Sequence, residues 1–244
     1  MLRPIGFIES CYREKFGTPR QGALVPQAPA RLRILPEFIP EQSLVGLSEF
    51  SHVWLIFHFD LNTNKAFLSK IHPPRLQGKT MGIFASRSPH RPCPIGLTLA
   101  RLKAVAGDTL VLEGVDLVNG TPVLDVKPYI PACDRPERPR IGWVHRARAP
   151  RLKVEFTRAA LADLRNVVPA RSRAKVKRLI EGSLSHDPRN PRDKAQLRPE
   201  RRLAFFILHY DAHFHVRGRS AIVGRIFHAD EAARRRPPLA SRLV

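Results

Sequence analysis

The sequence has little cysteine, few aromatic residues and no long apolar run. Its 244 residues include 3 cysteines, 2 tryptophans and 3 tyrosines. The cysteines are widely spaced and never in a CxxC arrangement, so we expect neither a disulfide framework nor a four-thiolate zinc site. No apolar run approaches the roughly 18 residues of a membrane span, and the N-terminus lacks a signal-peptide pattern. We therefore predict a cytoplasmic protein without a membrane partner.

Acidic residues are also scarce. The chain carries 42 Lys and Arg against 21 Asp and Glu, a formal net charge of +21. Residues 1–134 hold 15 basic and 11 acidic side chains, whereas residues 135–244 hold 27 basic and 10 acidic ones. Because a cationic surface that neutralises phosphates releases their counterions, the second part is predicted to bind RNA or DNA. A merely solvated basic surface is the alternative, also for the basic stretch RSRAKVKRLIEG.

Residues 1–134 are predicted to form a β-domain. Their apolar runs are short, rich in Val, Ile, Leu or Phe, and separated by Pro, Gly and the turn signal Asn119-Gly120. Helical periodicity is weak, so strands in a barrel or sandwich are expected. The predicted strands are IGFIESCY, RLRILPEF, HVWLIFHF, MGIFAS, GLTLARLKAV, DTLVLEGV and TPVLDVKPYI.

A proline-rich, charged stretch over residues 135–150 is predicted to be a linker. Beyond it, apolar residues recur at helical spacing in two groups, within 161–168 and 176–184. LAFFILHYDAHFHV and SAIVGRIF then indicate two strands around the turn RGR. Residues 151–230 are therefore expected to form a small basic α+β domain, followed by a frayed basic tail at 231–244.

Four polar side chains alternate in one of these predicted strands, namely His209, Asp211, His213 and His215. Neighbours two positions apart on a strand are about 7 Å apart, so one metal ion cannot readily bind three of them. We therefore expect no metal site, and either an RNA-facing surface or a solvated strand face instead.

The stretch RSPHRPCPIG, residues 87–96, has the most unusual composition. Its three prolines lack amide donors, so the stretch is not expected to be a central strand. Residues that precede proline are pushed out of the helical region, which predicts an extended, polyproline-like and stiff segment. Such a segment would hold Arg87 and Arg91 with little entropy to lose on ordering. A rigid loop whose arginines are solvated is the alternative.

Four separated motifs resemble those of the TsaA-like (TrmO) family, in the same order. They are YREKFGTPRQ, SEFSHVWLIFHF, PPRLQGKTMGIFASRSPHRPCPIGLTLARL and LEGVDLVNGTPVLDVKPYIPACD. The resemblance covers roughly residues 1–134, and Cys93 stands where the family usually has Asn. The later half is similar to the TrmO C-terminal domain, but DPRNPRD at 187–193 departs from the usual DPRPAYR.

This resemblance implies a mainly β protein, with a single-sheet antiparallel β-barrel and a smaller α+β C-terminal domain. It also implies a homodimeric enzyme that uses S-adenosylmethionine to methylate N6 of threonylcarbamoyladenosine at position 37 of tRNA. The chain has no GxGxxG after a predicted strand, so a Rossmann-type cofactor site is not expected. A cofactor- or RNA-binding module without methyl transfer is the main alternative, and a methyltransferase for a small molecule is another.

The resemblance further implies a set of cofactor-binding residues: Pro19, Arg20, Gln21, Asp60, Leu61, Arg87, Leu97, Pro122, Val123, Leu124 and Asp125. An arginine can grip a carboxylate in a bidentate manner, and an aspartate can accept hydrogen bonds from ribose hydroxyls or an ammonium group. Strand alternation also predicts that Val123, Asp125, Lys127 and Tyr129 share one face.

The threonyl carboxylate of the implied substrate predicts a cationic pocket. Its candidate residues, with one aromatic neighbour, are Arg75, Arg91, Lys127 and Tyr129. The acceptor nitrogen must lose a proton, so a general base would help. Asp125 and Tyr129 are two candidates for that base, and the sequence identifies no catalytic residue.

Overall fold

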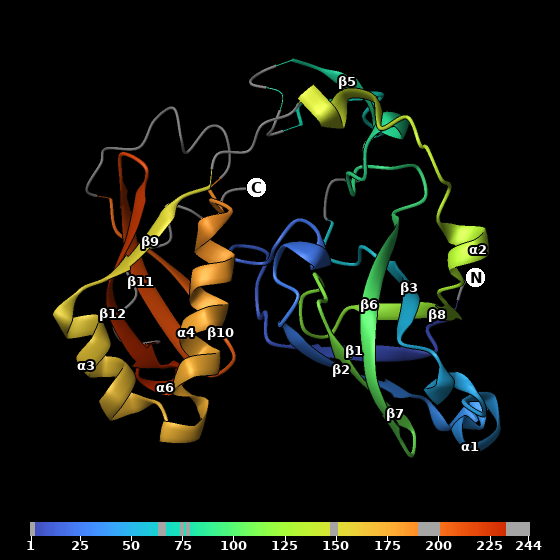
Figure 1. The fold of residues 1–244 in the computed structure, drawn as a ribbon, viewed down its shortest axis with the longest axis horizontal. Helices are drawn as coiled ribbons and strands as arrows, with labels where there is room; N and C mark the ends of the chain where they lie inside the picture. The colour runs from blue at the N-terminus through green and yellow to red at the C-terminus, as the bar shows by residue number, and fades with distance from the viewer. Residues whose placement is uncertain are drawn as a thin grey trace. The chain divides into compact units, whose positions relative to one another are not determined.

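The computed structural model describes residues 3–62, 67–73, 76, 79–146, 151–189 and 201–232. The chain divides into two compact units (Figure 1). The first unit comprises Met1–Ser10 and Arg20–Ala149, and the second comprises Cys11–Pro19 and Pro150–Val244. The predicted basic tail lies outside the described residues from residue 233 onward.

The first unit is built on a closed barrel of six strands, in which all neighbours pair antiparallel. The order around the barrel is β1-β2-β7-β6-β3-β8. The strands are β1 (Gly6–Ser10), β2 (Pro29–Ile34), β3 (His52–His58), β6 (Ile95–Ala106), β7 (Thr109–Glu113) and β8 (Pro122–Pro128). The predicted fold class is confirmed.

Short elements surround this barrel: η1 (Gly22–Leu24), η2 (Pro36–Phe38), α1 (Pro40–Ser43), η3 (Leu47–Glu49), β4 (Lys70–Ile71), β5 (Met81–Gly82), η5 (Ile83–Ala85), α2 (Pro131–Asp134) and η6 (Gly142–Arg146). The prediction of a strand at MGIFAS is wrong beyond its first two residues. Met81–Gly82 pairs with Lys70–Ile71 outside the barrel, and the chain then turns into η5. Ile83 is buried while Phe84 is exposed, so the segment lacks the second packed side chain that would hold it in a sheet.

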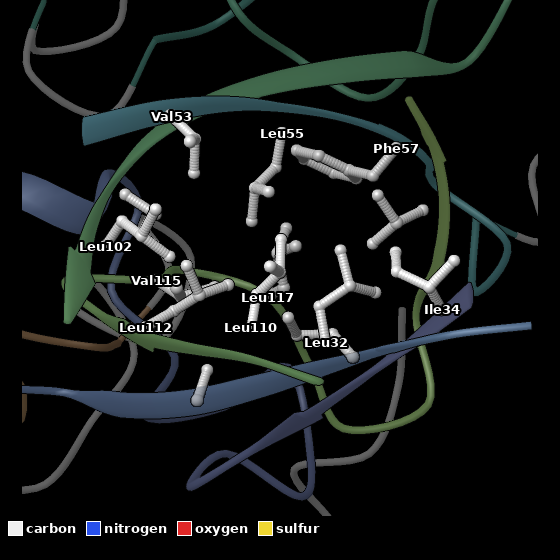
Figure 2. Close-up of a cluster of buried hydrophobic side chains, with 14 residues drawn as sticks. Leu32, Ile34, Val53, Leu55, Phe57, Leu102, Leu110, Leu112, Val115 and Leu117 are labelled. Carbon is white, nitrogen blue, oxygen red and sulfur yellow. The ribbon is translucent and has the colours of Figure 1, made fainter. Parts of the chain in front are cut away.

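The barrel interior is filled by alternating side chains of its strands (Figure 2). In β3, Val53, Leu55 and Phe57 are buried, while the residues between them are only partly so. Successive side chains of a strand point to opposite faces, so every second residue enters the core. The apolar lumen is therefore a packed core, and a ligand must bind at the barrel ends or on its outer wall.

The second unit is a four-stranded sheet in the order β10-β11-β12-β9, with helices packed on it. Its elements are β9 (Lys153–Phe156), α3 (Arg158–Val167), α4 (Ala170–Ser185), β10 (Leu203–Ile207), β11 (Tyr210–Arg217), β12 (Ser220–His228) and α6 (Ala229–Ala232). Strand β9 pairs parallel with β12, and the other pairs are antiparallel. Among the described residues of the chain, no helix is long and apolar enough to cross a membrane.

The prediction that LAFFILHYDAHFHV is one strand is wrong. It forms two strands, β10 and β11, joined by a turn at Leu208 and His209. Leu208 adopts a positive φ of 56°, a conformation usually taken by Gly or Asn. Because the turn contains neither residue, the apolar pattern runs through it without a visible break.

The segment Cys11–Pro19 belongs to the second unit although it follows the first barrel strand. The carbonyl oxygen of Cys11 accepts a 2.8 Å hydrogen bond from the amide of Leu208. The ring of Phe16 stacks on Phe214 with centroids 6.2 Å apart, and the α-carbon of Gly17 lies against Phe205. The N-terminal segment thus completes the packing of a sheet formed almost 200 residues later.

Candidate cofactor site

The stretch RSPHRPCPIG forms a bent loop between η5 and β6. As predicted, residues 87–94 do not form a strand. The expected extended, polyproline-like course is wrong, because the chain bends at residue 89 and again at residues 91–93. Serine hydroxyls hold these bends. The Ser86 hydroxyl accepts from the amide of Ser88 at 3.3 Å, and the Ser88 hydroxyl accepts from the amide of His90 at 3.4 Å.

Arg87 connects this loop to the loop after β1. Its side chain is exposed, and Nη1 donates a 2.6 Å hydrogen bond to Oε1 of Gln21. Gln21 is the residue before η1, and its Nε2 in turn donates to the backbone carbonyl of Arg20 at 2.6 Å. The predicted cofactor residues Arg20, Gln21 and Arg87 therefore lie together, although 66 positions separate Gln21 from Arg87 in the sequence.

The end of β3 reaches the same loop. The amide of Phe59 donates to the carbonyl of Pro94 at 2.8 Å, and Nδ2 of Asn62 donates to the carbonyl of Pro89 at 3.0 Å. Asp60 and Leu61 lie between these two anchors, and both side chains are exposed. The structure thus brings this predicted pair beside the loop that carries Arg87.

A β-bulge in β8 corrects the predicted strand alternation. Ile56 of β3 pairs with Asp125, but the next residue, Phe57, pairs with Val123, so Leu124 is the extra residue. Val123 is fully buried in the core, whereas Asp125 lies on the outer wall beside Ile56. Val123 and Asp125 therefore do not share a face, and the side chain of Val123 is not accessible to a ligand.

The outer wall carries two more predicted residues next to Ile56. Leu97 of β6 pairs with Ile56 on the side opposite to Asp125 and is 47% exposed. Leu97 and Asp125 are thus separated by two strand spacings, roughly 10 Å. Pro122 begins β8 at the same end of the barrel, because its neighbour Val123 pairs with Phe57 near the end of β3.

Two predicted substrate residues continue this wall. Lys127 forms a 2.9 Å ion pair with Asp125, and both side chains are largely exposed. Tyr129 follows β8, and its ring meets those of Trp54 and His52 edge-on at centroid distances of 6.0 and 6.4 Å. The wall therefore joins charged groups to an aromatic cluster.

Asp116 is a site residue that the sequence reasoning missed. It follows β7 and interacts with the Thr98 hydroxyl, the amide of Gly22 and the charge of Arg87. Its Oδ1 is buried and has no hydrogen-bond partner among the residues that the structure describes. Burial raises the pKa of this carboxyl above its ordinary value, while Thr98 and Arg87 act in the opposite direction. The signal available in the sequence was a carboxylate between two apolar residues, Val115 and Leu117, both of which are buried in the structure.

The remaining predicted residues are placed less directly. Arg91 donates from Nη1 to the carbonyls of Ser86 and Ile83 at 2.8 and 3.3 Å, so its guanidinium is already engaged within the loop. Pro19 ends the segment that packs with the second unit. Arg75 lies outside the described residues.

In the second unit, part of the predicted phosphate-binding helix serves local structure. Arg173 donates to the carbonyls of Val168 and Arg165 at the end of α3, and Lys177 pairs with Glu181 at 2.6 Å. Nε2 of His213 lies 3.2 Å from Oδ2 of Asp211. Within the described parts of the chain, no three His, Cys, Asp or Glu side chains are grouped to hold a metal ion.

Comparison with known proteins covers both units. The family model for the tRNA-methyltransferase O N-terminal domain matches residues 7–135, and the TrmO C-terminal domain model matches residues 149–229. A solved structure described as a crystal structure of TrmO superposes with a TM-score of 0.75 at 36% identity. That match covers 93% of this chain and 98% of the other.

Relatives from several organisms are also similar. A putative S-adenosylmethionine-dependent methyltransferase, RcsF, of Pseudomonas aeruginosa is 40% identical over 88% of this chain and 91% of the relative. The tRNA (adenine(37)-N6)-methyltransferase of Rattus norvegicus is 49% identical over 56% of this chain, but only 32% of the longer rat protein is matched. The Escherichia coli enzyme of the same name is 39% identical over 63% of this chain and 67% of its own length. The chain belongs to the tRNA-methyltransferase O family.

Proposed function

We propose that this chain transfers the methyl group of S-adenosylmethionine to N6 of threonylcarbamoyladenosine at position 37 of tRNA. The observation that supports this proposal is the hydrogen bond between Gln21 and Arg87 on a TrmO-family barrel, whose outer wall carries Leu97 and Asp125 on either side of Ile56. The names of the rat and Escherichia coli relatives supply the reaction class and the position in tRNA. The threonylcarbamoyl group is our more specific inference.

The exposed residues of this site fit the chemistry of the methyl donor. Arg87 is an exposed cation that can turn one side of its guanidinium toward a carboxylate, and Asp125 is a partly exposed anion that can accept from hydroxyl or ammonium groups. Leu97 presents an apolar surface for a purine ring. S-adenosylmethionine supplies an activated methyl group when bound, so the protein's task is to position two partners and exclude water.

The outer wall also supports a role in holding the acceptor. We propose that Lys127 and Arg91 provide positive charge for the threonyl carboxylate, and that Tyr129 contacts the acceptor base. Transfer would exchange the proton of the acceptor nitrogen for the methyl group, with the carbon–sulfur bond of the donor breaking, and Asp125 and Tyr129 are the candidate bases that would take the proton. Asp125 is held by Lys127 at 2.9 Å and accepts from the amide of Val126 at 2.8 Å, so its carboxylate has a defined orientation.

Methyl transfer tests this proposal directly. Tritium from labelled cofactor should enter tRNA that carries the threonylcarbamoyl group, and not tRNA that lacks it. Arg87→Ala and Asp125→Ala should weaken cofactor binding in calorimetry, whereas Arg101→Ala, on the same strand as Leu97 but paired with Glu113, should not. If both Arg87→Ala and Asp125→Ala bind the cofactor with wild-type affinity, the assignment of these residues to the cofactor site is wrong. If the chain transfers no methyl group to any tRNA, it is a binding module and not a methyltransferase.

We also propose that the chain acts as a homodimer. A hollow of about 550 Å³, which Asp125 helps to line, is formed mostly by the segment from Phe38 to Phe50, and most of its lining residues are apolar. In the same segment Val45 is 80% exposed, and Ile39 is also exposed. Contiguous exposed apolar surface favours association, and a second copy here would lie next to the cofactor site. Light scattering should give twice the chain mass, and Val45→Asp should reduce it.

A cytoplasmic location is the last part of this proposal. The three cysteines are free thiols, and Cys93 and Cys133 are exposed. Exposed thiols persist in a reducing compartment, which is also where tRNA is modified next to its anticodon. Fractionation of cells that express the tagged chain should recover it with the cytoplasmic tRNA.

A further inference from the structure

The net positive charge of residues 1–134 comes from one segment. No Asp or Glu occurs between Asp60 and Asp108, whereas that interval holds eight Lys and Arg residues. The rest of residues 1–134 holds seven basic and eleven acidic side chains and is therefore net negative. The acid-free segment, residues 61–107, includes β4, β5, η5 and the RSPHRPCPIG loop. A polyanion approaching the barrel would be drawn to this segment.

An exposed aromatic ring lies in the middle of this segment. Phe84 in η5 is 73% exposed, whereas the preceding Ile83 is buried and anchors the turn. The guanidinium of Arg91 lies 5.6 Å from the ring centroid of Phe84 and is itself held by the carbonyls of Ile83 and Ser86. Both the ring and the cation are therefore positioned by the loop before any partner binds.

Two segments that are hydrogen-bonded to η5 expose further apolar groups. Nε1 of Trp143 in η6 donates a 2.8 Å hydrogen bond to the carbonyl of Ala85, which places η6 against η5; Figure 1 draws this yellow turn next to β5. Ile141 and Val144 on either side of Trp143 are exposed. Leu68, also exposed, precedes the residue whose carbonyl accepts from the amide of Ile83. The segments bonded to η5 thus expose apolar side chains, and the acid-free segment itself supplies cations and no carboxylate.

We infer that Phe84, backed by Arg91, is a platform on which an unpaired base of the tRNA stacks. Single-stranded RNA is recognised by aromatic rings that stack on bases, combined with cations that follow the phosphates. A purely apolar protein partner would have no use for the excess of positive charge. The inference depends on the proposed function for the identity of the RNA, and it adds a contact surface in the barrel unit to the strongly basic second half of the chain.

The experiment compares Phe84→Ala and Phe84→Tyr with a matched control, Phe7→Ala. Phe7 is an exposed phenylalanine, 47% accessible, on β1 and outside the acid-free segment. Loss of one stacked base should weaken binding of a tRNA anticodon stem-loop by about fivefold to a hundredfold in Phe84→Ala. Phe84→Tyr should restore most of the affinity, Phe7→Ala should bind as wild type, and all three should bind S-adenosylmethionine normally.

Binding and methylation are measured separately, so that the two proposals can fail separately. Unchanged stem-loop affinity and unchanged KM for tRNA in Phe84→Ala would overturn the platform while leaving methyl transfer intact. If the wild-type chain methylates no tRNA, the proposed function fails, but stem-loop binding still decides the role of Phe84. A shift of Phe84→Ala from dimer to monomer in light scattering, with stem-loop affinity unchanged, would assign the surface to contact between copies and overturn the inference.

Discussion

The α-carbon of Gly22 packs directly on the backbone of Gly114. A Cβ added to Gly22 would lie 1.9 Å from the carbonyl oxygen of Gly114, far closer than nonbonded atoms can approach. Gly22 follows Gln21, which bonds to Arg87, and Gly114 precedes the loop that carries Asp116. This contact therefore sets the position of the loop that carries Gln21 relative to the buried carboxylate of Asp116, and only glycine allows it.

Gly22→Ala should destabilise the protein by roughly 1–3 kcal/mol, as overpacking against a backbone atom does. It should also weaken cofactor binding, because relief of the clash moves Gln21. Thermal unfolding and calorimetry measure the two effects. Gly82→Ala is the matched control, since nothing lies within 4 Å of its Cβ position and its φ is −60°. Equal melting temperatures for the two variants would contradict the close contact between Gly22 and Gly114.

Asp116→Asn should raise stability at neutral pH. Since burial raises the pKa of Asp116, the folded protein binds a proton more tightly than the unfolded chain does. Wild-type stability therefore falls as pH rises from the ordinary aspartate pKa through the raised value, and the asparagine variant lacks this loss. The melting temperatures of the two should converge on acidification and separate toward neutrality.

The same Asp116→Asn variant should bind the cofactor less well, because Asp116 interacts with Gly22 and with Arg87, a proposed cofactor residue. A variant that is more stable yet weaker in cofactor binding would indicate that a buried charge is retained for function. Calorimetric titration with S-adenosylmethionine provides the measurement. Unaltered affinity, together with the stability gain, would show that Asp116 plays no part in the site.

Phe16→Ala should destabilise the second unit by roughly 1–3 kcal/mol, less than the loss for a fully buried phenylalanine. The ring stacks on Phe214, which is itself buried beside Phe205. Hydrogen exchange should accelerate in β10 and β11, while the barrel strands should be unaffected. The neighbouring exposed residue offers the control Lys15→Ala, for which a change within about 0.5 kcal/mol is expected. Exchange that increases only in the barrel would show that Phe16 packs elsewhere.

The three thiols should differ in reactivity. Cys93 and Cys133 are exposed, whereas Cys11 is buried, and burial raises the pKa of its thiol to about 12. The thiolate is the reactive form, so Cys11 stays protonated and inert at mildly alkaline pH. Titration with a disulfide reagent should detect two thiols in the folded protein and the third only in denaturant. Cys93→Ser should leave a single fast thiol, and a fast reaction at Cys11 would contradict the packing of residues 11–19.

Much of the barrel could be predicted because its strands alternate regularly. In HVWLIFHF the inward positions Val53, Leu55 and Phe57 are apolar, and the turn signal Asn119-Gly120 lies next to β8. The β10–β11 hairpin could not be predicted in the same way, because its turn has a positive φ at Leu208 and contains no glycine or asparagine that would indicate a turn. The bulge at Leu124 was equally hidden, since an extra residue becomes apparent only when two strands are paired.

By itself, the sequence determined the family, the strand content of the barrel and the segments that supply the proposed cofactor residues, because these follow from local patterns and motifs. Tertiary structure decided which of those residues can act together. Pairing of β3 with β6 and β8 placed Leu97 and Asp125 on the outer wall and directed the side chain of Val123 toward the core. Packing also brought Asp116 within electrostatic reach of Arg87 and carried residues 11–19 to the second unit. Such relationships join residues far apart along the chain, and only the closing of the fold brings them within contact distance.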